Sequence, residues 1–262
     1  MIPLRDNIPS RTTPLINYAI IGITSVVFYI QLQKPELVEQ FGMIPARVSN
    51  PSEPVAIRDA RIARTPFGDE VVEFSRPALP SPIPAWLTPL SCILLHGGWM
   101  HFIGNMWFLY IFGDNVEDRF GHVGYLFFYM GTGVLASLTH LFTNSSSAVP
   151  TIGASGAIAG VMGAYFLLYP RANVLTLIPL FIFIEILVIP APLFLGFWFL
   201  LQFFQGTTMK ATGVAWWAHI GGFVAGLAIA YLLKRARRLR PRVETVRPHT
   251  DRPTMYRVNF WR

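Results

Sequence analysis

The sequence from Phe120 to Pro170 reads FGHVGYLFFYMGTGVLASLTHLFTNSSSAVPTIGASGAIAGVMGAYFLLYP and contains no Asp, Glu, Lys or Arg. A helix needs about 20 mainly apolar residues to cross a bilayer, so this stretch is long enough for two spans. Four small polar residues, Asn144 to Ser147, interrupt it and are typical of a loop. We therefore predict one membrane helix over residues 122–143 and another from about Gly153 to Tyr169.

The rest of the chain lacks charge in similar blocks. Of its 262 residues, 53% are hydrophobic and 13% are charged, whereas a soluble domain carries about 25% charged residues. Charge is absent from residues 12–33, 77–113 and 211–233. A soluble core would require helices with polar faces, and these segments have none. The sequence therefore predicts an all-α, polytopic membrane protein.

We expect a bundle of six membrane helices. Residues 172–206 are too long for one upright span, so an embedded re-entrant segment is expected up to about Pro190, followed by a helix to about Gly206. The other five helices are expected at about 14–33, 99–118, 122–143, 153–169 and 213–234.

Basic residues after the last predicted span indicate the orientation of the bundle. They are Lys234, Arg235, Arg237, Arg238, Arg240 and Arg242. An even number of spans places both chain ends on one side, and the positive-inside rule assigns that side to the cytoplasm. We expect a cytoplasmic tail over residues 1–13, a six-helix membrane domain over 14–234 with an outer loop over 34–98, and a basic cytoplasmic tail over 235–262. The expected location is the plasma (inner) membrane, and this placement of the +7 net charge favours lipid over nucleic acid as a partner.

Ser155 is the first candidate for chemistry, because polar residues inside spans are costly and mark functional sites. It lies in Gly153-Ala154-Ser155-Gly156, at the start of an apolar helix. Glycine on both sides allows close approach to the hydroxyl. The free N–H groups of a helix N-terminus favour a developing oxyanion. Taken alone, however, the pattern fits a serine that caps a helix even better.

His219 is the second candidate. It lies in Ala218-His219-Ile220-Gly221-Gly222, and Gly222 and Gly226 share its helical face. A comparable stripe in the helix of Ser155 consists of Gly156, Gly160 and Gly163. Such stripes allow two helices to pack closely in a bilayer, although most of them are purely structural. Close packing would bring the imidazole within the roughly 3 Å that a Ser–His hydrogen bond needs.

His101 and Asn105 form a third group, because residues four apart face one side of a helix. Both can act as neutral donors to an oxyanion, although hydrogen bonding between helices is the common alternative. The acids Asp114, Glu117 and Asp118 lie near the inner end of the same helix. We therefore predict a Ser–His dyad rather than a triad.

Three other histidines and two tryptophans are assigned non-catalytic roles. His122, His140 and His249 have no polar partners in sequence and are expected to be structural or solvated. Trp216 and Trp217 are interpreted as interfacial anchors. There is no His-Glu-x-x-His motif, and no carboxylate or thiolate joins His96, His101 and His219 at useful ligand spacing, so no metal site is predicted.

These motifs together resemble those of the rhomboid proteases. HGGWMHFIGN at residues 96–105, followed by EDRFG at 117–121, looks like the second-helix signature of that family. The Ser155 motif with Gly160 and Gly163 resembles the fourth-helix nucleophile motif, and the His219 motif with Gly226 resembles the sixth-helix base motif. The resemblance covers about residues 86–234.

The resemblance implies an intramembrane serine endopeptidase that cleaves membrane protein substrates in or near their transmembrane segments and needs no cofactor. Ser155 would be the nucleophile and His219 the general base. The Ser155 backbone N–H, His101 and Asn105 would form the oxyanion hole. The alternative is a non-catalytic rhomboid-like protein that binds membrane clients. A transporter or channel is disfavoured, because we find neither internal repeats nor paired midplane charges.

Two positions depart from the family pattern. Trp86 is followed by Leu87, where the family often has Trp-Arg. Ala159 stands where many members carry an aromatic residue that packs on the base. We therefore expect His219 to be held less firmly, or by another ring.

Overall fold

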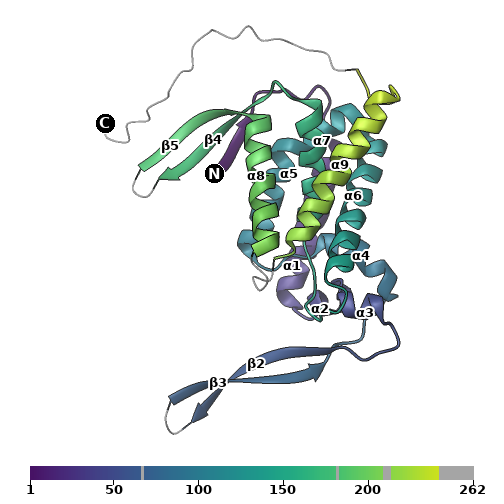
Figure 1. Cartoon of the computed structure of the whole chain (residues 1–262), viewed down its shortest axis with the longest axis vertical. Helices are drawn as coiled ribbons and strands as arrows, with labels where there is room; N and C mark the ends of the chain where they lie inside the picture. The colour runs from purple at the N-terminus through teal and green to yellow at the C-terminus, as the bar shows by residue number, and fades with distance from the viewer. Residues whose placement is uncertain (66–67, 181–182, 209–213, 242–262) are drawn as a thin grey trace.

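The computed structural model describes residues 1–65, 68–180, 183–208 and 214–241. The last part of the predicted basic tail, residues 242–262, lies outside the described residues. Six helices form the bundle (Figure 1): α1 (Leu15–Gln33), α5 (Trp99–Phe120), α6 (His122–Thr143), α7 (Ser155–Leu168), α8 (Ala191–Thr208) and α9 (Trp216–Arg235). They lie where the charge-free blocks predicted helices, to within a few residues.

Three of these helices are long and apolar enough to cross a membrane by length and composition: α1, α6 and α9. The other three miss this criterion, and for α5 and α7 the reason is plain. Helix α7 has only 14 residues, and α5 carries the polar residues His101, Asn105, Asp114 and Asn115 among its apolar ones.

The fold is mostly helical, as predicted, but it is not all-α, because two sheets accompany the helices. One is a three-stranded sheet of β1 (Ile2–Asp6), β4 (Asn173–Leu180) and β5 (Phe183–Pro190), in the order β1-β4-β5. The other is the hairpin of β2 (Ala56–Thr65) and β3 (Gly68–Pro77). The two hairpins project from opposite ends of the bundle (Figure 1), which we call the β4–β5 end and the β2–β3 end.

The re-entrant segment predicted up to Pro190 is an antiparallel hairpin instead, in register from Asn173↔Pro190 to Leu180↔Phe183. Its sequence is rich in Val and Ile, which pack well on a pleated surface. Residues 1–13, predicted as a tail, supply strand β1, which pairs with β4. The start of α8 is also tied to this region, since Ala191 N donates to Ala172 O over 2.8 Å.

The predicted outer loop 34–98 is mostly ordered. Besides β2 and β3 it contains five short helices: α2 (Leu37–Phe41), α3 (Pro45–Ser49), η1 (Ala85–Leu87), α4 (Thr88–Ser91) and η2 (Cys92–Leu94). An ion pair joins the β2–β3 hairpin to α2, where Arg76 Nη2 lies 2.8 Å from Glu39 Oε2. The Arg76 hydrogen bonds hold the pKa of the Glu39 carboxyl below its usual value, although partial burial acts in the opposite direction.

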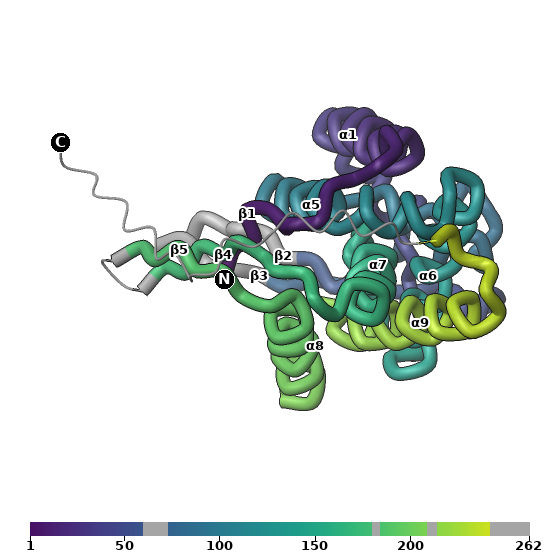
Figure 2. The backbone as a smooth tube through the Cα atoms, turned by 90° about the horizontal axis from the view of Figure 1, so that it is seen from above, coloured from purple at the N-terminus to yellow at the C-terminus, as the bar shows by residue number. Residues whose placement is uncertain are grey.

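Helix α7 occupies the centre of the bundle, with α5, α6, α8 and α9 around it (Figure 2). All its residues from Gly156 to Tyr165 are buried. Its closest neighbour is α9, and glycine makes this possible. A Cβ atom at Gly226 would collide with the carbonyl oxygen of Gly160, and one at Gly163 with that of Phe223. The two helices thus touch backbone to backbone, as small residues permit in a membrane.

Buried and part-buried polar contacts hold the N-terminal segment to α5 and α7. Tyr165 Oη donates to Asp6 Oδ2 over 2.5 Å, and Asn115 Nδ2 donates to the same oxygen over 2.9 Å. Trp107 Nε1 donates to the Pro3 carbonyl over 2.6 Å. Glu117 accepts the N–H groups of the first turn of α1, including that of Asn17 over 2.8 Å. A carboxylate at a helix N-terminus offsets its unpaired N–H groups and its positive dipole end.

The glycine contact generates a prediction about stability. Gly226→Ala should separate α9 from α7 and lower the free energy of unfolding by about 1–3 kcal/mol, the usual range for overpacking. Gly131→Ala is the matched control, because a Cβ at that helical position meets nothing within 4 Å. Thermal unfolding of both variants in detergent measures the difference, and equal melting temperatures would contradict the prediction.

Asp6 generates a prediction about pH. Burial raises the pKa of its carboxyl from 3.8 to about 6, although the bond from Tyr165 opposes the rise. The protonated acid therefore favours the folded state. This contribution is complete below about pH 3.8 and is lost as pH rises through 6, where repulsion from the neighbouring Asp114 adds to the loss.

We expect deprotonation of Asp6 to lower the free energy of unfolding by up to about 3 kcal/mol between pH 4 and pH 7. Asp6→Asn cannot ionise, so its melting temperature should fall less over the same range. Melting curves of both proteins at the two pH values test this. Parallel falls would show that Asp6 does not control the attachment of β1.

Candidate active site

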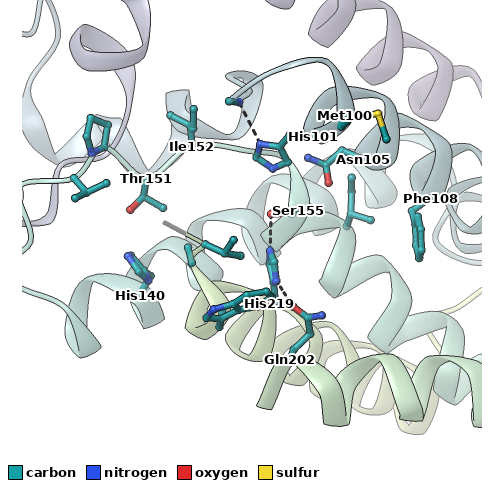
Figure 3. Close-up of a pocket in the computed structure, with 18 of the residues that line it drawn as sticks. Met100, His101, Asn105, Phe108, His140, Thr151, Ile152, Ser155, Gln202 and His219 are labelled. Atoms are coloured by element: carbon teal, nitrogen blue, oxygen red, sulfur yellow. Dashed lines mark hydrogen bonds between the residues drawn. The ribbon is translucent and has the colours of Figure 1, made fainter. Parts of the chain in front are cut away.

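A cavity of about 820 Å³ lies at the start of α7, toward the β2–β3 end of the bundle (Figure 3). Residues of α5, α6, α7, α8 and α9 line it, together with the loop that leads into α7. The polar side chains on its wall are His101, Asn105, His140, Asn144, Ser147, Thr151, Ser155, Gln202 and His219. None of the described lining residues is an acid, so any charge that develops inside must be stabilised by neutral groups.

The loop before α7 fixes the position of Ser155. Thr151 pairs with Met43 in an antiparallel bridge, and Gly153 N donates to the Cys92 carbonyl over 2.9 Å. Gly153 has a φ of 126°, a conformation that side chains rarely adopt. A Cβ there would also lie 2.8 Å from the His101 ring. Glycine at 153 thus serves both the turn and the close approach of His101.

Ser155 is the first residue of α7, so its own N–H and those that follow have no partner within the helix. Its hydroxyl faces α9, where His219 lies one turn from the helix start. Ser155 Oγ lies 2.8 Å from His219 Nε2. The structure therefore brings together the two residues predicted as a dyad, at hydrogen-bond distance.

The other side of the His219 ring is also occupied. Its Nδ1 lies 2.6 Å from Gln202 Oε1, on α8 (Figure 3). The ring of Trp198 lies 5.9 Å from the imidazole, centroid to centroid, and the ring of Trp216 lies 6.0 Å away at 85°. Of the two alternatives raised by Ala159, the structure favours the second: other rings pack on His219.

His101 and Asn105 face the same cavity from α5. The backbone N–H of Gly97 donates to His101 Nδ1 over 3.2 Å, so a neutral His101 carries its proton on Nε2, the nitrogen beside Gly153. The amide Nδ2 of Asn105 is buried and has no partner among the described residues. Both side chains thus present an uncommitted donor close to Ser155 (Figure 3).

Sequence reasoning missed several residues of the site, among them Trp198. His140 was assigned a structural or solvated role and Trp216 an anchoring role, yet both line the cavity. Gln202 was overlooked, although a glutamine in the middle of an apolar span is itself a signal of function. The acids lie elsewhere, as expected: Glu117 and Asp118 bond to the N-terminal segment and the start of α1. Among the described residues, no group of three His, Cys, Asp or Glu is arranged to hold a metal ion.

Comparisons with known proteins agree with the motifs. The family model of the Rhomboid domain matches residues 84–236, more than half of the chain. Rhomboid-like protein 11, chloroplastic, of Arabidopsis thaliana is 40% identical over 78 residues, which are 30% of this chain and 28% of that protein. Rhomboid protein 1, mitochondrial, of Saccharomyces cerevisiae is 28% identical over 152 residues, 54% of this chain and 40% of that protein.

A bacterial relative has a similar match. Rhomboid protease GluP of Bacillus subtilis is 31% identical over 150 residues, 56% of this chain and 26% of that protein. The matches thus span between 26% and 40% of the length of these three relatives. Together with its apolar helices, the domain match identifies the chain as an integral membrane protein that belongs to the rhomboid family.

Proposed function

We propose that this chain is an intramembrane serine endopeptidase that hydrolyses peptide bonds in or near the transmembrane segments of membrane proteins. The observation that carries the proposal is the 2.8 Å contact of Ser155 Oγ with His219 Nε2 at a helix N-terminus inside a cavity. A helix-capping serine does not need a histidine on its hydroxyl, so the capping interpretation leaves this contact unexplained.

In the proposed mechanism Ser155 Oγ attacks the scissile carbonyl carbon while His219 Nε2 takes the hydroxyl proton. The carbonyl oxygen gains negative charge and accepts hydrogen bonds from the Ser155 N–H, His101 Nε2 and Asn105 Nδ2. When the C–N bond breaks, His219 returns the proton to the departing amine, which leaves an acyl ester on Ser155. Water then attacks the ester, with His219 as base again, and frees the serine and the new carboxylate.

We further propose that all six bundle helices cross the bilayer and that residues 14–234 form the membrane domain. In this arrangement the β4–β5 end and the basic residues after α9 lie in the cytoplasm, with both chain ends. The cavity then opens toward the outer face. The plasma membrane is our proposed location.

The central experiment uses the purified full chain in liposomes with a model single-span substrate. We expect cleavage by the native protein and a loss of at least about 10³-fold in Ser155→Ala and His219→Ala, as for other serine hydrolase dyads and triads. Ser25→Ala is the matched control, because the hydroxyl of this serine donates to the Ile21 carbonyl within α1. Cleavage that survives Ser155→Ala would refute the mechanism. A folded native protein that cuts no substrate would favour the non-catalytic, client-binding alternative.

The oxyanion hole is tested separately. Asn105→Ala and His101→Ala should each lower kcat by about 10²–10³-fold, the usual cost of one oxyanion donor, with a much smaller effect on KM. Initial cleavage rates over a range of substrate densities separate the two constants. Circular dichroism and melting curves show whether each variant is folded. A folded Asn105→Ala with native kcat would exclude its amide from the site of charge development.

A further inference from the structure

Gln202 is a polar residue that α8 holds inside an apolar environment. It is 8% exposed, and the other buried residues of α8 are Ala191, Phe194 and Leu195. An amide removed from water costs free energy unless its hydrogen bonds are replaced. Its oxygen meets Nδ1 of His219 at 2.6 Å, across the boundary between two helices. Gln202 thus contacts Nδ1, whereas Ser155 contacts the other ring nitrogen, Nε2.

We infer that Gln202 is a positioning residue that fixes the tautomer and the orientation of His219. An amide oxygen can only accept a hydrogen bond, so Nδ1 must carry the imidazole proton. The lone pair of the neutral ring is then left on Nε2, 2.8 Å from the Ser155 hydroxyl. This is the tautomer that a general base needs. The inference rests on the proposed function, and it gives the dyad a third, uncharged member.

The surroundings of His219 make Gln202 the group that selects the tautomer. Trp198 lies near the ring at a centroid distance of 5.9 Å, and Trp216 stands edge-on at 6.0 Å. Such ring contacts restrict tilting but do not distinguish one nitrogen from the other. The contact with Gln202 lies along the Nδ1 direction and does distinguish them. No acid lines the described cavity wall that could do so in its place.

Gln202 also helps when the ring becomes charged. After proton transfer, the positive imidazolium keeps its Nδ1–H bond to the amide oxygen, which carries partial negative charge. In serine proteases that orient the histidine with an aspartate, asparagine in its place lowers kcat by about 10⁴-fold, because the histidine is then held in the wrong tautomer. Removing Gln202 takes away an acceptor without imposing that tautomer. An amide supplies orientation without a full charge. We therefore expect a smaller loss, about 10- to 100-fold, when Gln202 is removed.

Three variants of the full chain in liposomes test the inference. Gln202→Leu should lower kcat by about 10- to 100-fold and leave KM within about twofold, because the ring is misoriented while the substrate site is intact. Gln202→Glu keeps the acceptor and adds a charge that favours the protonated ring. It should retain more activity than Gln202→Leu, and the acidic limb of its activity–pH profile should move to higher pH. The control is Gln205→Leu, which removes a glutamine of α8 that does not line the cavity.

Two outcomes of these assays would overturn the inference. One is a Gln202→Leu protein with native kcat. The other is a Gln202→Glu protein whose pH profile is unchanged. Absence of cleavage by the native protein, or cleavage that survives Ser155→Ala, would refute the proposed function instead, so the two failures are distinguishable.

A second measurement does not depend on cleavage. In protein labelled with ¹⁵N histidine, the His219 signals are identified by their absence in His219→Ala. We expect a protonated, pyrrole-type Nδ1 and an unprotonated, pyridine-type Nε2 at neutral pH, and a shift toward the other tautomer in Gln202→Leu. A pyridine-type Nδ1 in the native protein would overturn the inference even if the enzyme is active.

Discussion

The backbone contact between α7 and α9 is the constraint on which the rest of the site depends. Gly163 on α7 and Gly226 on α9 leave no room for a side chain between the two helices. At this separation, a serine at the start of one helix and a histidine in the first turn of the other can share a proton. In a bilayer, apolar burial does not drive helices together, so close packing of small residues must supply much of the attraction. The same glycines therefore serve both stability and the proposed chemistry.

The ends of α7 are fixed by different means. At the β2–β3 end, the chain before Ser155 is held by backbone bonds to Met43 and Cys92, which belong to the ordered outer segment. At the β4–β5 end, Tyr165 reaches the carboxylate of Asp6 in the N-terminal strand. Segments far apart in sequence thus secure a helix that has no polar face of its own.

The sequence predicted the helices well, because an apolar run of about 20 residues without charge is typical of a membrane span. The break at Asn144–Ser147 and the turn at Gly121 placed α6 at the bounds that the structure shows. The hairpin over 173–190 was not predicted, because a mainly apolar run has no period that separates a buried strand from a membrane segment. Strand β1 was missed for a related reason. Five residues carry no periodic signal, and their partner β4 lies more than 160 residues away.

Site residues that lie in sequence motifs could be predicted, whereas residues that belong to the site only through a contact with His219 could not. Ser155, His219, His101 and Asn105 stood out as polar residues in spans, and the structure gathers them around one cavity. Their geometry could not be deduced, since it depends on how α5, α7 and α9 pack. Gln202 and Trp198 belong to α8, whose sequence has no motif, and their relation to His219 exists only in the folded bundle.

A neutral site is a reasonable solution for a cavity surrounded by lipid-facing helices. A carboxylate beside His219 would have to be moved from water into a medium of low dielectric constant, which costs several kcal/mol. A charged imidazolium would form only during the proposed reaction. Its ion pair with the carboxylate therefore could not offset this cost in the resting protein. An amide costs much less to bury and still accepts a hydrogen bond from Nδ1. Its contribution is orientation, and the two tryptophan rings limit the remaining freedom of the imidazole. Low polarity would also strengthen each hydrogen bond from a neutral donor to the proposed oxyanion. The proposed reaction can then rely on fixed dipoles, and a charged third member of the dyad becomes unnecessary.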